Sequence, residues 1–147
     1  MIEKLLAEIK TAMKTKDSTR LITLRSLMSE AKNIAINDKR KDVSTDDIIT
    51  ALTKGIKLRE DSYASYKDAG RNDLADKESY EIDVLKEFQP KQLTELEVVA
   101  LVDDVIASLG VVTKKDMGRV MGEVMKNITK GSVDNKMVSK IVGSKLN

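Results

Sequence analysis

The residues Phe88-Gln89-Pro90-Lys91-Gln92-Leu93-Thr94-Glu95-Leu96-Glu97 divide the chain into two parts. Pro90 is the only proline among the 147 residues, and a proline disfavours a helical backbone at the residue before it. Thr94 and Glu97 have the spacing of a capping box, in which two side chains bond to backbone N–H groups at the start of a helix. The stretch therefore predicts that one helix ends near Phe88, that another begins at Thr94, and that a short joint connects them.

On the N-terminal side of this joint, apolar residues recur every three or four positions, which is the period of an amphipathic helix. Four helices are predicted, over about 1–15, 18–37, 44–70 and 74–88. Ser18 is the expected N-cap of the second helix, and Ser44 with Asp47 forms a capping box for the third. Because the connections between these helices are short, we expect residues 1–90 to fold as an antiparallel four-helix bundle.

On the C-terminal side the same period predicts three shorter helices, over about 94–110, 113–131 and 134–146. We expect residues 91–147 to form a compact three-helix tail lobe. The joint lacks glycine, so an articulated contact is favoured over a flexible linker. The predicted fold class is therefore all-α, with a four-helix bundle followed by a three-helix lobe.

The composition excludes most familiar chemistry. Aromatic residues make up only 3% of the chain, which argues against an all-β fold. With no cysteine and no histidine, the chain has no disulfide, no thiolate nucleophile, no serine–histidine triad and no cysteine or histidine ligand for a transition metal. Adjacent acids such as Asp103 and Asp104 point about 100° apart on a helix, which is poor geometry for a shared metal. We therefore predict no catalytic residue, no metal site and no cofactor.

The sequence also predicts a cytoplasmic protein without a membrane partner. Its longest apolar run, Val98 to Val102, is far shorter than the roughly 20 residues that span a bilayer. The first residues include the acids Glu3 and Glu8, which targeting peptides avoid.

The charge is concentrated at the C-terminal end. The net charge is only +2, yet residues 110–147 carry eight basic and three acidic side chains. Such a basic segment either binds a polyanion or simply forms a solvated surface.

The predicted helix over 113–131 is the most informative one for function. Gly118 and Gly122 lie in its interior, where each glycine costs roughly 1 kcal/mol relative to alanine. At 100° per residue, both glycines fall between the apolar face and a narrow basic arc. The arc consists of Lys115, Arg119, Lys126 and Lys130. Lys114 stands beside the exposed amides at the start of the helix, which also favour anions.

Two explanations fit these glycines. Small residues four positions apart can let a neighbouring helix come close. Alternatively, they leave a bare backbone groove beside cations, which suits the phosphate backbone of a nucleic acid. The two explanations are compatible.

The string Lys115-Asp116-Met117-Gly118-Arg119-Val120-Met121-Gly122, followed by Gly131-Ser132-Val133-Asp134, resembles the YqeY family. Leu24-Arg25, Ala69-Gly70-Arg71 and Pro90-Lys91-Gln92-Leu93 extend the likeness over essentially the whole chain. That family is related to the C-terminal tail domain of the B subunit of the glutamine-dependent tRNA amidotransferase. The resemblance implies a helical bundle with a helical tail lobe. It also implies a link to tRNA-dependent amidation, a carbon–nitrogen ligation with glutamine as amide donor, in which the tail domain helps to hold tRNA.

The expected function is a non-catalytic helical module that binds tRNA or another structured RNA. RNA helices are recognised largely through shape, phosphates and 2′-hydroxyl groups, which requires basic side chains on a rigid face. The expected RNA contacts are Lys114, Lys115, Arg119, Lys126 and Lys130, with Gly118 and Gly122 permitting close approach. The alternative is a protein–protein adaptor that receives a partner's helix in the glycine seam, the strip at Gly118 and Gly122 between the apolar face and the basic arc. A ligase activity of its own would need a nucleophile, a phosphate loop or a metal site, and no motif indicates one.

Overall fold

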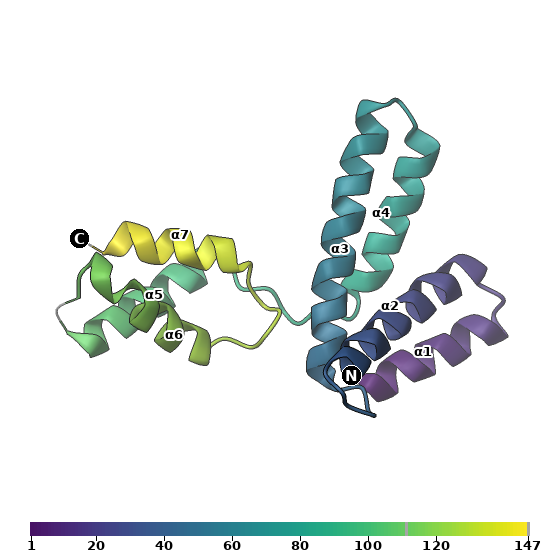
Figure 1. The fold of residues 1–147 in the computed structure, drawn as a ribbon. Coiled ribbons are helices and arrows are strands. Elements are labelled where there is room, and N and C mark those ends of the chain that lie inside the picture. The colour runs from purple at the N-terminus through teal and green to yellow at the C-terminus, as the bar shows by residue number, and fades with distance from the viewer. Residues whose placement is uncertain (111, 147) are drawn as a thin grey trace. The chain divides into compact units, whose positions relative to one another are not determined.

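The computed structural model describes residues 1–110 and 112–146, and every regular element in them is a helix (Figure 1). The α-helices are α1 (Ile2–Lys14), α2 (Ser18–Asn37), α3 (Thr45–Asp68), α4 (Asn72–Lys86), α5 (Glu95–Leu109), α6 (Met117–Lys126) and α7 (Asn135–Lys145), with a 3₁₀ helix η1 (Lys114–Asp116) before α6. The all-α prediction is confirmed for these residues. None of the helices in them is both long enough and apolar enough to cross a membrane.

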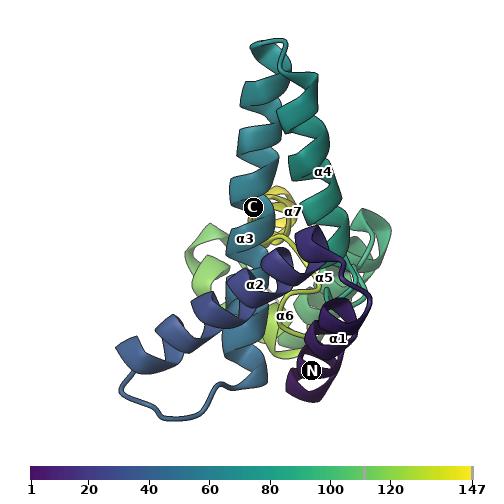
Figure 2. The same cartoon turned by 90° about the vertical axis from the view of Figure 1, so that its right-hand side faces the viewer.

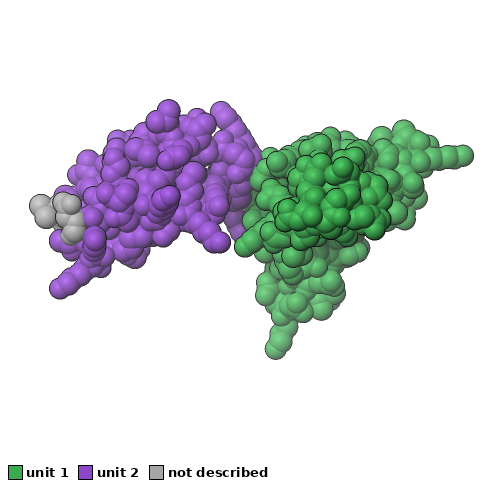
Figure 3. Space-filling model, turned by 90° about the horizontal axis from the view of Figure 1, so that it is seen from above, with its two compact units in different colours: residues 1–89 green, residues 90–147 purple. Residues whose placement is uncertain are grey.

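The chain divides into two compact units, residues 1–89 and residues 90–147, which we call the body and the tail lobe (Figure 3). Each has its own cluster of buried apolar side chains. The predicted tail segment 91–147 includes Val111 and Asn147, which lie outside the described residues.

The body consists of two helical hairpins, α1–α2 and α3–α4, and α2 crosses α3 at a steep angle (Figures 1 and 2). The buried side chains of α3 all lie between Asp47 and Ile56. Only the first half of α3 therefore packs against α2, while its second half pairs with α4. A single aligned four-helix bundle, as predicted for residues 1–90, is not confirmed, because the two hairpins cross instead of running side by side (Figures 1 and 2).

Local side-chain bonds fix where the body helices begin. Asp17, not Ser18, caps α2, since its carboxylate accepts from the N–H of Arg20 at 3.1 Å. The predicted capping box of Ser44 and Asp47 is present at the start of α3. The buried Asp47 also binds the Arg40 guanidinium at 2.6 and 2.8 Å. These bonds hold the pKa of Asp47 far below its ordinary value.

The tail lobe packs α5, α6 and α7 against one another around a core made largely of valine. Six valines are completely buried: Val98, Val102, Val120, Val124, Val138 and Val142. The segment that leads into the lobe is bonded to it as well. The N–H of Leu93 donates to the Ser132 carbonyl at 2.9 Å, and the Gln92 amide donates to the Gly131 carbonyl at 2.7 Å.

Candidate nucleic-acid interface

The region predicted as one helix over 113–131 is interrupted at both ends. At its start, the Asp116 carboxylate accepts from the N–H of Thr113 at 2.8 Å, and the Asp116 N–H donates to the Thr113 carbonyl at 2.8 Å. A bond between residues three apart closes a 3₁₀ turn, so Lys114 and Lys115 lie in η1 rather than in α6.

The helix also ends earlier than the sequence predicts. The Asn127 side chain donates to the Glu123 carbonyl at 2.9 Å, and asparagine favours such local bonds over the helix interior. The next backbone bonds, from Asn127 to Val124 and from Ile128 to Met125, span only three residues. Gly131 then adopts a φ of +84°. Lys130 therefore lies in the turn that follows α6.

These bounds correct the predicted basic arc. Only Arg119 and Lys126 lie on α6. They are seven positions apart, so they share one face of the helix and are separated by about 10 Å along its axis. Lys115 lies in η1 and Lys130 in the turn after α6, so these two basic residues flank α6 in sequence and do not follow the 100° rule of a continuous helix.

An acidic residue, Glu123, lowers the net charge of the predicted basic arc. The Lys126 ammonium lies 2.9 Å from the Glu123 carboxylate, and the two are three positions apart on α6. Among the described residues no ion pair involves Lys114, Lys115, Arg119 or Lys130, all of which are exposed. The charge of this surface therefore comes mainly from those four residues. The sequence carries a signal for this pair, because residues three positions apart on a helix, such as Glu123 and Lys126, lie on the same face.

The two glycines of α6 face open space. Both are exposed, and a Cβ atom added to Gly118 or Gly122 would meet no described atom within 4 Å beyond the adjacent residues and the backbone of α6 itself. The opposite face of the helix is buried through Val120 and Val124. No neighbouring helix of the tail lobe thus approaches the glycines, and helix packing within the lobe does not explain them.

The seam between the glycines and the buried face is lined by methionine. Met121 and Met125 are half-buried and lie beside the glycines at 100° per residue. Methionine is a flexible, polarisable side chain that is common at adaptable binding surfaces. The face of α6 therefore combines a bare backbone strip with cations on one side and methionines on the other.

A second basic pair lies on α7 and adds to the positive charge of the tail lobe. Lys136 and Lys140 are exposed on α7, and their spacing of four places them on one face of that helix. No group of histidine, cysteine, aspartate and glutamate residues in the described ranges is arranged to hold a metal ion.

Comparison with known proteins finds one family and several relatives that resemble this chain. The profile of the family described as Yqey-like protein matches residues 2–146. A Pyrenophora tritici-repentis protein named altered inheritance of mitochondria protein 41, mitochondrial, is 33% identical over 152 residues, which cover 99% of this chain and 82% of the relative.

Two further relatives match over shorter lengths. A protein with the same name from Kluyveromyces lactis is 36% identical over 88 residues, which cover 60% of this chain and 48% of the relative. An uncharacterized protein of Schizosaccharomyces pombe is 34% identical over 86 residues, which cover 58% of this chain and 68% of the relative.

Proposed function

The chain belongs to the Yqey-like protein family, and from this premise we propose that its tail lobe binds tRNA or another structured RNA without catalysing a reaction. The observation that supports this proposal most strongly is the open strip of backbone at Gly118 and Gly122 beside exposed cations. A helix surface without side chains lets a nucleic-acid strand come close, and the flanking basic groups can then neutralise its phosphates. The resemblance to the amidotransferase tail domain supports a role as an accessory to tRNA-dependent amidation or to other aminoacyl-tRNA metabolism.

We further propose that the body and the tail lobe are separate domains, a four-helix body followed by a three-helix lobe. Their two independent cores support this division. The proposed compartment is the cytoplasm. The relatives named as mitochondrial make the mitochondrial matrix the other compartment to examine, and tRNA is present in both.

The salt dependence of tRNA binding tests the RNA proposal. Replacing Lys115 and Arg119 together with glutamate removes two unpaired cations. The slope of log affinity against log salt should therefore fall in magnitude by about one to two units. The matched control is Lys10→Glu with Lys14→Glu on α1, which makes the same change of net charge on an exposed helix face of the body. Equal losses in both double variants would show that tRNA responds to net charge alone and would contradict the proposed surface.

The competing function is a protein–protein adaptor that uses the same seam. The half-buried Met121 and Met125 favour it. An apolar contact through these methionines would depend little on salt, whereas phosphate contacts weaken steeply as salt rises. Absence of tRNA binding by the unmodified protein at low salt would favour the adaptor.

A further inference from the structure

A small cavity in the body lies where α2 crosses α3. Its volume is about 160 Å³. Leu27, Ala51 and Leu85 are buried apolar residues that line it. Leu58 stands at its edge with 56% of its surface exposed, so the apolar surface continues outside the cavity.

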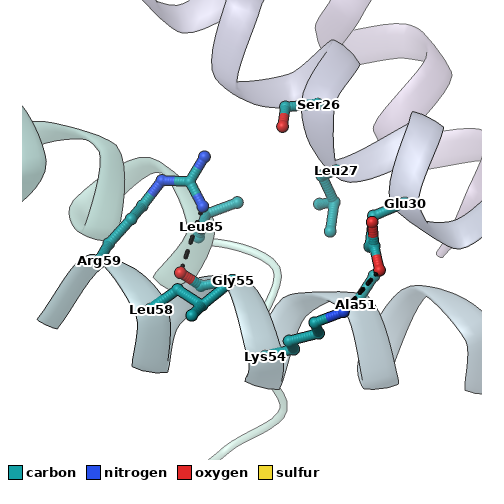
Figure 4. A pocket seen from close by; sticks show the side chains of 9 residues that line it. All are labelled: Ser26, Leu27, Glu30, Ala51, Lys54, Gly55, Leu58, Arg59 and Leu85. Carbon is teal, nitrogen blue, oxygen red and sulfur yellow. Dashed lines mark hydrogen bonds and ion pairs between the residues drawn. The ribbon is translucent and has the colours of Figure 1, made fainter. Parts of the chain in front are cut away.

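Arg59 supplies the fixed polar group of this cavity. Its Nε donates to the Glu81 carboxylate at 3.1 Å, and its Nη1 donates to the Gly55 carbonyl at 3.2 Å. The second terminal nitrogen, Nη2, has no partner among the described residues and points away from the Gly55 carbonyl (Figure 4). The guanidinium is therefore held at two of its nitrogens while the third can donate to a ligand.

Gly55 makes room for this arrangement. A Cβ atom at that position would lie 3.2 Å from Arg59 Nη1 and 3.5 Å from a methyl group of Leu85. An interior helix glycine weakens the helix, and here its absent side chain leaves space for the guanidinium at the cavity wall.

A second polar group of the cavity, the Ser26 hydroxyl, can donate or accept a hydrogen bond. The Ser26 hydroxyl points into the cavity from α2 (Figure 4). On the rim, Lys54 is already paired with Glu30 at 3.1 Å. Arg59 Nη2 is the one group here that can only donate and has no partner among the described residues, and it calls for an acceptor oxygen on the ligand.

The charges around Arg59 favour an uncharged acceptor over an anion. Glu81, only 13% exposed, already balances the guanidinium. The pKa of the neighbouring Glu78 is raised by burial and by the negative charge of Glu81. The two cations that line the cavity, Arg59 and Lys54, are thus each paired with a carboxylate, so a ligand carboxylate would meet no unbalanced positive charge, whereas a carbonyl oxygen needs none.

The size of the cavity selects the kind of ligand. Sites for drug-sized ligands have volumes of about 300–1,000 Å³, well above that of this cavity. Anchor side chains of protein interfaces fill small, desolvated pockets, and arginine is common among the residues that carry the binding energy there. We propose that the cavity receives one apolar side chain of leucine or phenylalanine size from a partner polypeptide, whose adjacent backbone carbonyl accepts a hydrogen bond from Arg59 Nη2. This inference is independent of RNA binding by the tail lobe.

Amide chemical shifts of the full ¹⁵N-labelled chain test this inference with three small probes. N-acetyl-leucine N-methylamide carries both the side chain and the carbonyl. N-acetyl-alanine N-methylamide lacks the anchor, and isovalerate replaces the amide with a carboxylate. The leucine probe should shift the amides of Ala51, Gly55 and Leu58 with a millimolar Kd. The alanine probe should bind at least about tenfold more weakly, and isovalerate should be weaker than the leucine probe.

The variant Gly55→Ala should abolish the response to the leucine probe while the melting temperature stays unchanged or rises. The matched control is Gly118→Ala, the same substitution at a helix position with open space, and it should leave the response intact. The proposal is overturned if the leucine probe causes no shifts around Gly55, if the alanine probe acts equally, or if Gly55→Ala responds like the unmodified protein. A stronger response to isovalerate would instead assign the cavity to a small carboxylate and would equally overturn the proposed partner.

Discussion

Replacing both glycines of α6 with alanine should stabilise the tail lobe and weaken its binding to RNA. Beyond the adjacent residues and the backbone of α6 itself, neither Cβ atom would meet a described atom within 4 Å, so the substitutions add no clash. Gly122 lies in the helix interior and should contribute about 1 kcal/mol of stability as alanine. Gly118 lies in the first turn, where the gain should be about half as large, because that turn has fewer intrahelical bonds.

The combined gain of about 1.5 kcal/mol corresponds to a rise in melting temperature of roughly 6 to 12 °C for a domain of this size. All aromatic residues of the chain lie between Tyr63 and Phe88 in the body. Tyrosine fluorescence therefore reports on the body alone, and circular dichroism at 222 nm reports on both units. The unfolding of the tail lobe is therefore identified as the transition whose melting temperature changes in circular dichroism but not in tyrosine fluorescence.

The matched control is Gly131→Ala in the same lobe. Gly131 has a φ of +84°, a conformation that costs a residue with a side chain about 1–2 kcal/mol. The tail transition of this variant should therefore move down. If Gly118→Ala with Gly122→Ala also lowers the melting temperature, the glycine strip is not open, and the geometric basis of the proposed function is wrong.

Three further predictions concern the body and the joint. Leu52 is 1% exposed, so Leu52→Ala should cost about 2–5 kcal/mol and lower the fluorescence-detected melting temperature without moving the tail transition. Because Arg40 lowers the pKa of Asp47, the ionised carboxylate stabilises the fold above its unfolded pKa of about 4. The advantage of the unmodified protein over Asp47→Asn in urea unfolding should thus shrink as the pH falls below that value. Mild proteolysis should cut first within residues 89–92 and leave a folded N-terminal fragment, and even cleavage throughout α1–α4 would contradict two separate domains.

The sequence predicts helix positions well where the local pattern decides them. The capping box of Ser44 and Asp47 was identified correctly because both partners lie within one turn of the chain. The pairing of Arg40 with Asp47 was not, because it depends on the path of the loop before α3. The steep crossing of α2 and α3 goes with burial limited to one half of α3, and a helical period alone does not reveal which part of a long apolar stripe is covered.

The candidate site shows the same limit. Periodicity places both glycines between the apolar face and the basic residues, and both are exposed in the structure. The positions of Lys115 and Lys130 were wrong because an apolar period continues across a 3₁₀ turn and through Asn127. The hydrogen bonds of Asp116 and Asn127 that interrupt the helix are local, but a pattern of apolar residues does not reveal them.

The most direct test of RNA binding by the tail lobe is the amide spectrum of the full ¹⁵N-labelled chain during addition of tRNA at low salt. The glycines provide reporters in both units of one molecule, since Gly55 and Gly70 lie in the body and Gly118 and Gly122 lie on α6. Substoichiometric tRNA should broaden the signals of Gly118 and Gly122 first and leave those of Gly55 and Gly70 sharp. Broadening that begins at the body glycines, or a spectrum unchanged by tRNA, would contradict the proposed function.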